Sequence, residues 1–413
     1  MKKKAALNIF VFTLAACFFL LPVKASAEVF EYKYVEGTRY RILSVVNQSV
    51  FINRELSHTA ETLNRIAVEV TGVKDDKGAH RAIFQSSERV LYNSLDGKQN
   101  AASSGFHWLR EYESIFERDR RGYLTIDSIY YMPVVRNVPV FPSKDLKVGE
   151  KWHADAHEVH DFRDSFGIQQ PYKIPFRAFY EYLGEREWKG KKYPAFSVNY
   201  NIESRPSPVR GRLYPVLISG TFKQSVFWDR AAGQEKAYNE EFSLTFEMSN
   251  RMIIEFRGTA EAELVESVEM NKERLAAEIN EEIKRLNIPE VSVREVKEGV
   301  SISLDDIRFY ADLDKMLPGE ERKLERIADI LKRYRDRDIL VGGHTALAGT
   351  ADERMILSQQ RAKVVADYLL SKNVRTADRM VIRGYGALRP VADNNTEEGM
   401  RKNRMVEITI LEN

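Results

Sequence analysis

Residues 254–264 alternate strictly between apolar or small side chains and polar or charged ones. The even positions carry Ile254, Phe256, Gly258, Ala260, Ala262 and Leu264. Because successive side chains of a β-strand point to opposite faces, this run predicts a long strand with one apolar and one charged face. Residues 218–228 and 242–248 repeat the pattern, and Ala232 and Gly233 stand between them. The three runs predict an antiparallel meander.

The segment from residue 28 to residue 268 is mostly of this period-two character. Further strands are expected around 30–34, 39–52, 66–70, 82–84 and 196–201. We therefore predict a β-rich, antiparallel, sandwich-like N-terminal region. A break near 138–149 contains Pro139, Pro142 and Gly149, which are residues that interrupt strands. It leaves two arrangements open, one sandwich or two subdomains split near 138–149.

Long alternating strands are also typical of an outer-membrane barrel. Such a barrel must keep one face of every strand apolar through the hydrocarbon layer. Residues 40–53 and 152–161 place charged and amide side chains too densely for that requirement. The sequence therefore favours a soluble β domain over a membrane barrel.

The first 27 residues have the composition of an export signal. Lys2, Lys3 and Lys4 precede an apolar stretch at 5–21, and small residues lead up to a cleavage site after Ala27. The alternative is lipidation of Cys17, the single cysteine, which follows Leu14, Ala15 and Ala16. Cleavage after Ala27 would leave no thiol in the mature chain, and hence no disulfide.

The composition narrows the classes of partner. The 413 residues are 43% hydrophobic and 30% charged, enough for two or three ordinary cores. The formal net charge is only +2, and no basic block dominates one segment, so nucleic acid is not an expected partner.

A connecting helix is predicted at 269–288. Asn271 has the chemistry of an N-cap, and Leu275, Ile279, Ile283 and Leu286 recur at helical spacing. The segment is too short for several heptads, so an amphipathic connector lying on one domain is expected.

Residues 289–413 predict a separate α+β domain. Alternation at 291–295 and 300–304 indicates strands, and Pro318 stands where a helix would begin. That helix has a buried stripe of Leu324, Ile327, Ala328 and Leu331. A short strand at 339–341, a second helix at about 352–371 and two strands at 380–383 and 405–411 follow, the last two joined by a polar loop. The order is βαβαββ, with two helices on one sheet face.

Three ordered motifs lie within this domain. They are Gly343-His344-Thr345, then Leu357-Ser358 with Arg361-Ala362, and finally Asn403-Arg404 before Val406, Glu407 and Ile408. In this order they resemble the OmpA-like (Pal-type) family over about residues 300–411. The resemblance implies an α+β domain that tethers envelope proteins to peptidoglycan.

The resemblance also implies a binding site. Arg354, Ser358 and Arg361 are spaced by four and three residues, so they project from one side of the second helix, toward Thr345 and Ala346. In the family, the arginine at position 361 holds a carboxylate of diaminopimelate, and an aspartate at position 346 holds its ammonium. This chain has Ala346 there, and Arg354 where the family has asparagine. The candidate peptidoglycan-binding residues are Arg361, Thr345, Ser358, Arg354, Asp352 and Asn394.

Three interpretations of the altered site stay open. The site binds a stem peptide with a different diamino residue, or it has lost the cell wall and serves as a scaffold or protein contact. In the third, Asp352 or Glu353 supplies the missing carboxylate.

No enzyme or cofactor site is predicted. A Ser-His-Asp order, a G-x-S-x-G motif and a phosphate loop are all absent from the sequence. His153, Asp155 and His157 share one strand face, but ligands on a straight strand do not converge on a metal, so a solvated face is expected. His344 is expected to hydrogen-bond or pack.

We therefore predict a non-catalytic envelope protein of a diderm bacterium, in the periplasm or at the outer membrane. Its partner is peptidoglycan, with a stem that need not contain diaminopimelate, or other envelope proteins. The alternative is that the β-rich region binds lipid, glycan or a partner protein.

Overall fold

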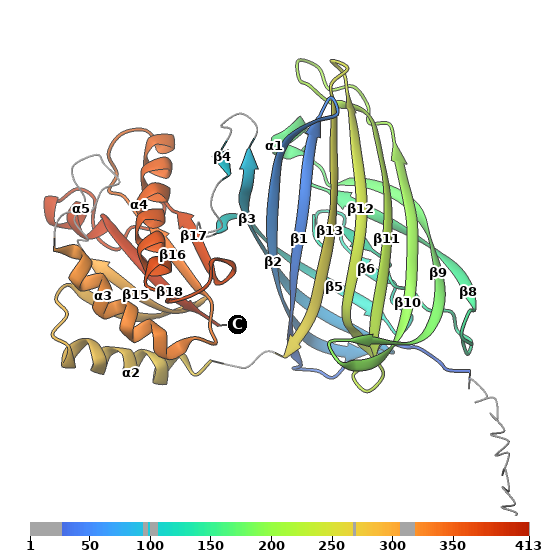
Figure 1. Ribbon diagram of the computed structural model, residues 1–413, viewed down its shortest axis with the longest axis horizontal. Helices are drawn as coiled ribbons and strands as arrows, with labels where there is room; N and C mark the ends of the chain where they lie inside the picture. Colours follow the sequence, from blue (N-terminus) through green and yellow to red (C-terminus); the bar gives the residue numbers. More distant parts are fainter. Residues whose placement is uncertain (1–26, 94–97, 100–105, 267–269, 306–318, 413) are drawn as a thin grey trace, which may run out of the picture.

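The computed structural model describes residues 27–93, 98–99, 106–266, 270–305 and 319–412, arranged as two parts side by side (Figure 1). Cys17, the rest of the predicted signal before Ala27, and Pro318 lie outside the described residues. The expected α+β class, with a β-rich N-terminal region, is confirmed.

The N-terminal part is built almost entirely of strands. In chain order its elements are β1 (Arg39–Ile52), β2 (Glu55–Lys74), β3 (Lys77–Asn93), β4 (Lys98–Gln99), β5 (Phe106–Asp119), β6 (Leu124–Ile126), β7 (Val135–Arg136), β8 (Lys151–His160), α1 (Arg163–Phe166), β9 (Tyr172–Trp188), β10 (Lys191–Ser204), β11 (Pro215–Asp229), β12 (Gln234–Met248) and β13 (Ile253–Glu266). The predicted meander is confirmed, since β11, β12 and β13 pair in sequence order and antiparallel.

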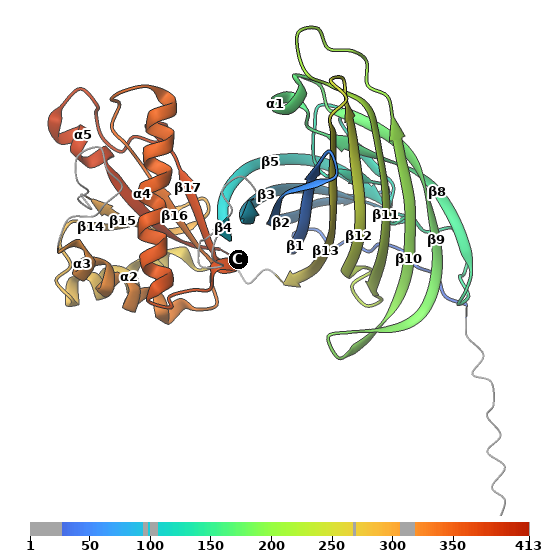
Figure 2. The same ribbon diagram turned by 45° about the horizontal axis from the view of Figure 1, so that its top comes forward.

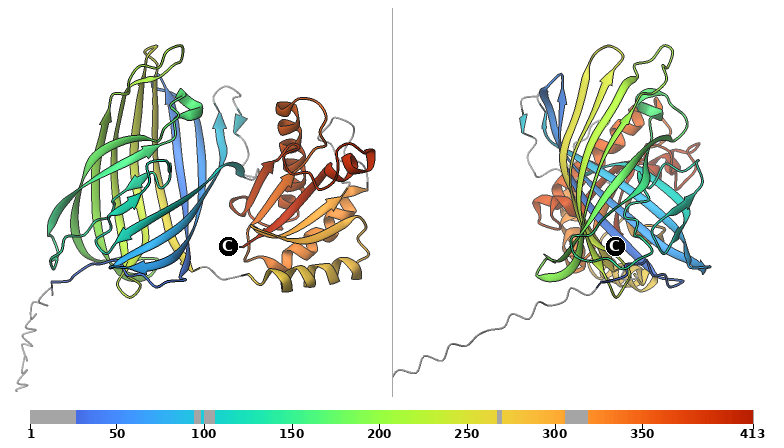
Figure 3. Two further views of the ribbon diagram at one scale, coloured as in Figure 1. Left: turned by 180° about the vertical axis from the view of Figure 1, so that it is seen from behind. Right: turned by 90° about the vertical axis from the view of Figure 1, so that its right-hand side faces the viewer.

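One continuous sheet contains all the longer strands. Neighbours follow the order β6–β5–β3–β2–β1–β13–β12–β11–β10–β9–β8–β7. The pairing of β1 with β13 joins the two halves, so the strands before and after the segment 138–149 belong to the same sheet. The sheet curves until its two halves face one another, as Figures 2 and 3 show. Aromatic and aliphatic side chains pack between the facing walls.

The strand expected at 30–34 does not form. Glu28 makes a single bridge to Leu146, and Tyr32 and Lys33 then donate backbone hydrogen bonds to separate turns, at Arg120 and Gly233. The segment crosses several strand connections, so no neighbouring strand runs alongside it. Its aromatic side chains instead fill a buried cluster. That cluster contains Phe30, Tyr32, Phe141, Leu146, Tyr182, Phe196 and Trp228.

The predicted connecting helix is confirmed as α2 (Lys272–Arg285). The Asn271 side chain accepts a hydrogen bond from the Arg274 N–H at 2.9 Å, which satisfies one of the free donors of the first turn. Leu275, Ile279 and Ile283 are buried in the core of the C-terminal part. Among the described residues, no helix combines the length and apolar character that a membrane crossing requires.

The C-terminal part is a mixed sheet with helices packed on it. Its elements are β14 (Val291–Val296), β15 (Gly299–Asp305), α3 (Glu320–Leu331), η1 (Lys332–Tyr334), β16 (Ile339–Gly343), α4 (Ala351–Ser371), η2 (Ala377–Arg379), β17 (Met380–Gly384), α5 (Glu397–Asn403) and β18 (Met405–Leu411). The strand order is β14–β15–β18–β16–β17, with β16 and β17 parallel. The predicted buried stripe of α3 is confirmed. The last connection, expected to be a loop, also contains α5, which Thr396 caps by accepting from the Gly399 N–H.

The two parts contact each other directly. The start of β5 pairs in parallel with β17, through Phe106 opposite Val381 and His107 opposite Ile382. Figure 2 shows β5 arching from the C-terminal part into the curved sheet. A buried ion pair joins Arg65 Nη2 of β2 to Asp338 Oδ2 at 2.8 Å. The two parts are therefore joined in two ways, by strand pairing and by a buried ion pair.

Candidate functional site

Two glycines at the ends of β16 and β17 set the position of helix α4. Gly343 and Gly384 are paired neighbours in the parallel ladder. A Cβ added at Gly343 would lie 2.0 Å from the carbonyl oxygen of Ser358, and one at Gly384 would lie 2.7 Å from Ser358 Oγ. The helix therefore rests directly on the strand backbone, a distance that only glycine permits.

Ser358 is fixed by this close approach. Its hydroxyl donates to the Met355 carbonyl at 2.8 Å and accepts from the Gly386 N–H at 2.9 Å. The Gly386 carbonyl in turn accepts from the Thr345 N–H at 2.8 Å. Gly386 thus joins the loop that follows β16 to the helix α4, and Arg361 lies one turn further along that helix.

The third motif holds the loop from the other side. Leu347 N–H donates to Asn394 Oδ1 at 3.2 Å, and Asn403 Nδ2 donates to the same oxygen at 2.9 Å. Asn403 Oδ1 also accepts from the N–H groups of Val391 and Ala392. Asn403 therefore holds the segment of Val391 and Ala392 in place, and Asn394 bridges Asn403 to the loop of Thr345.

The predicted site residues differ in burial. Thr345, Ala346, Ser358 and Arg361 are all buried, whereas Asp352 is exposed and Arg354 is intermediate. Arg354 Nη1 donates to the Gly349 carbonyl. Glu353 belongs to a capping box with Thr350, whose N–H donates to Glu353 Oε2 at 2.9 Å. The structure joins Thr345 and Ser358 through Gly386 and directs the carboxylate of Glu353 to the start of the helix.

The site offers donors and a positive charge. Among the described residues, none makes a hydrogen bond to the buried hydroxyl of Thr345. Arg361, which is 9% exposed as a residue, brings a guanidinium whose Nε is buried. At position 346, where the family pattern has an aspartate, this chain presents the buried methyl group of Ala346. No group of three or more histidine, cysteine, aspartate or glutamate side chains that could hold a metal occurs in the described part of the chain.

Residues 308–404 match the model of the OmpA family. This segment is an OmpA-like domain. The resemblance expected from the three motifs is confirmed, and the OmpA-like domain contains both the glycine-supported helix and the loop of Thr345.

Relatives of the OmpA-like domain are envelope proteins by name. Peptidoglycan-binding protein ArfA of Mycobacterium tuberculosis is 39% identical over 104 residues, which cover 25% of this chain and 32% of the relative. Outer membrane porin F of Pseudomonas aeruginosa is 36% identical over 115 residues, covering 28% of this chain and 33% of the relative. The chain thus spans about a third of the length of these relatives. The solved cell wall anchor of the T6SS from Pseudomonas aeruginosa shares 31% identity over 34% of this chain and 99% of that chain, with a TM-score of 0.29.

One functional group of the OmpA-like domain had no role assigned from the sequence. Glu407 is buried on β18, where its Oε1 lies 3.1 Å from His344 Nε2 and its Oε2 accepts from Arg294 and Ser301. The expectation that His344 hydrogen-bonds is consistent with this pair. The alternation of 405–411 indicates a buried acid, because Glu407 faces away from Val406 and Ile408 on a strand that is central in the sheet.

Gly343→Ala is expected to destabilise the OmpA-like domain by about 1–3 kcal/mol, the usual cost of overpacking. The added methyl group would collide with the Ser358 carbonyl, which is backbone and cannot rotate away. Urea unfolding followed by circular dichroism measures the change. Gly72→Ala is the matched control, because a Cβ at that position meets nothing within 4 Å. Equal effects of the two substitutions would contradict the glycine-supported placement of α4.

Proposed function

We propose that this chain is a non-catalytic protein of the cell envelope whose OmpA-like domain contacts peptidoglycan at the junction of α4 with the loop of Thr345. The observation that carries the proposal is the buried guanidinium of Arg361 one turn beyond the fixed Ser358. Arginine presents a rigid fork that binds a carboxylate through two hydrogen bonds, and stem peptides carry carboxylates. Relatives of the domain bearing the name peptidoglycan-binding protein support the same ligand class.

Ala346 argues for an altered stem peptide. A methyl group cannot hold an ammonium ion, so the site keeps an anion partner and lacks the acid that the family pattern places there. Glu353 does not replace it readily, because its carboxylate accepts hydrogen bonds from Thr350. We infer a stem whose carboxylate meets Arg361 and whose amino group is absent or differently placed. Asp352 is the remaining acid at the helix start, and it is exposed.

The location follows from the same proposal. An export signal ending at Ala27 would deliver the chain to the periplasm, where the OmpA-like domain meets the wall and an outer-membrane association becomes accessible. Cleavage after Ala27 and acylation of Cys17 are told apart by the mass of the mature N-terminal peptide.

Arg361→Ala is expected to reduce retention of the mature protein on the host's own sacculi by roughly 10- to 100-fold. This factor corresponds to the usual contribution of a hydrogen bond to a charged group. A sedimentation assay with purified sacculi measures it. Arg322→Ala, an exposed arginine on α3, is the control and should leave retention unchanged. If the unaltered protein does not sediment with the sacculi, the proposal is wrong.

Ala346→Asp tests the recognition of the amino group separately. The new carboxylate is expected to raise retention on walls that contain diaminopimelate, while retention on the host's own sacculi rises less or falls. Circular dichroism checks that the buried acid is tolerated. If the substitution folds and changes retention on neither wall, the stem-peptide interpretation of this site is wrong.

A further inference from the structure

The curved N-terminal sheet and the segments that cross it border a partly open cavity of about 620 Å³. Protein interiors leave few voids larger than a water molecule, whereas ligand pockets span about 300–1,000 Å³. Apolar side chains line it, among them Ile66, Ile42 and Leu264, which lie side by side on the neighbouring strands β2, β1 and β13, and Val226 on β11. A space of this size and lining fits a small apolar chain.

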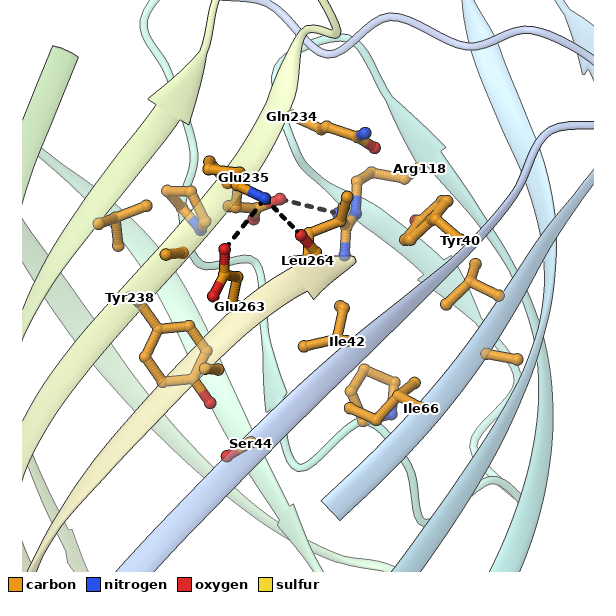
Figure 4. A pocket seen from close by; sticks show the side chains of 18 of the residues that line it. Tyr40, Ile42, Ser44, Ile66, Arg118, Gln234, Glu235, Tyr238, Glu263 and Leu264 are labelled. Atoms are coloured by element: carbon orange, nitrogen blue, oxygen red, sulfur yellow. Dashed lines mark hydrogen bonds and ion pairs between the residues drawn. The ribbon is translucent and has the colours of Figure 1, made fainter. Parts of the chain in front are cut away.

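One end of the cavity is polar. Figure 4 shows Arg118, Glu235 and Gln234 gathered there, apart from Ile42 and Ile66. Arg118 lies on β5 with its side chain 19% exposed, and its guanidinium carbon stands 4.8 Å from the centre of the Tyr32 ring. Glu235 Oε1 accepts a hydrogen bond from the Tyr32 hydroxyl at 2.5 Å.

Arg118 carries hydrogen-bonding capacity that the described residues do not use. Its ion-pair partner, Glu235 Oε2, is 3.9 Å from Nη1, which is beyond hydrogen-bond distance. Among the described residues, the buried Nε of Arg118 has no hydrogen-bond acceptor, although the guanidinium has five N–H donors. Burial acts to lower the pKa of Arg118, but Tyr32 and Glu235 outweigh it and raise the pKa, so the group stays charged. A buried cation without hydrogen-bond acceptors is costly unless a ligand supplies them.

The other charges around the cavity are largely matched. Lys236 Nζ lies 3.2 Å from Glu263 Oε1 and donates to the Leu264 carbonyl at 2.7 Å. Burial raises the pKa of Glu240 to about 7, so this lining acid is partly neutral at neutral pH. Arg118 is therefore the cation at the cavity best placed to attract an anion.

We propose that the N-terminal region binds a single-chain amphiphile, with its alkyl chain in the cavity against Ile42, Ile66 and Val226 and its anionic head on Arg118. A carboxylate or a phosphate monoester supplies the same acceptor chemistry, so fatty acids and alkyl phosphates are both candidates. This site is separate from the OmpA-like domain and does not depend on peptidoglycan binding.

Calorimetric titration of the mature, delipidated protein with alkyl carboxylates of 8 to 14 carbons, below their micelle concentrations, tests the site. Affinity is expected to rise about fourfold for each added methylene, the transfer free energy of one CH₂, until the cavity is full. Dodecyl phosphate and dodecanol extend the series, the first to identify the preferred anion and the second as a neutral head. The anions are expected to bind at least tenfold tighter than the alcohol.

Arg118→Gln should abolish the preference for the anions over dodecanol while keeping the dependence on chain length. Arg120→Gln, an exposed arginine two residues away on the same chain segment, is the matched control and should change neither. Ile66→Trp fills the apolar middle and should abolish binding of every chain, which keeps the test open if Arg118→Gln fails to fold. Failure of all the amphiphiles to bind, equal binding of acid and alcohol, or an unchanged anion preference in Arg118→Gln would overturn the proposal.

Discussion

Asp338→Ala is expected to lower the free energy of unfolding by about 3–5 kcal/mol and to separate the two parts of the molecule. Asp338 precedes β16 and is 12% exposed, and its carboxylate accepts from Arg65 of β2 at 2.8 Å and from Arg379 Nε at 2.8 Å. Its removal would leave Arg65 buried without a carboxylate, and a buried uncompensated charge is the costly outcome. Thermal unfolding should change from one transition to two, and small-angle scattering should show a larger radius of gyration.

The exposed pair of Asp367 with Lys363 is the control for this prediction. Both side chains are 42% exposed and lie four residues apart on α4. Exposed helical pairs contribute only about 0.3–0.5 kcal/mol, so Asp367→Ala should keep a single transition. If Asp338→Ala lowers the free energy of unfolding by less than about 1 kcal/mol, the Arg65–Asp338 pair does not hold the two parts together.

The stability of the OmpA-like domain is expected to fall as the pH drops from about 4.5 through about 2. Burial alone would raise the pKa of Glu407, but the hydrogen bonds and charges of His344 and Arg294 outweigh it and lower the pKa to about 2. A carboxyl with a depressed pKa stabilises the folded state above its unfolded pKa, and that contribution is lost as it becomes protonated in the fold. The amount is on the order of 3 kcal/mol.

Glu407→Gln should lose this stabilisation at pH 7 and should depend less on pH between 7 and 2. Urea unfolding at a series of pH values measures both effects. Glu397→Gln, at an exposed glutamate where α5 begins, is the control and should keep the acid dependence of the unaltered chain. An identical pH profile for Glu407→Gln would show that the buried network does not stabilise the fold.

Local patterns predicted the elements that depend on neighbours in sequence. The alternation of 254–264 became β13, Asn271 caps α2, and the three C-terminal motifs identified the OmpA-like domain. Each of these rests on a period or a cap that a short segment specifies by itself.

Long-range pairings could not be read in the same way. An apolar strand face shows that it will be buried but not against what, so the pairing of β1 with β13 and of β5 with β17 had no signal in the sequence. The cavity depends on those pairings. Arg118 could have been noticed, because in the strand of 106–119 it shares a face with Phe116, whereas the acidic residues of the strand lie on the opposite face. The altered position Ala346 was visible at once, since it departs from a motif.

Strand β5 gives the molecule a fixed internal length. At its first residues, Phe106 and His107 pair with the OmpA-like domain, and near its last residue Arg118 faces the cavity. Twelve residue steps along a strand amount to about 40 Å of contour. An amphiphile held at one end and a cell wall contacted from the other would be kept at a set separation by covalent backbone alone, so lengthening β5 would change the reach of the protein without altering either site.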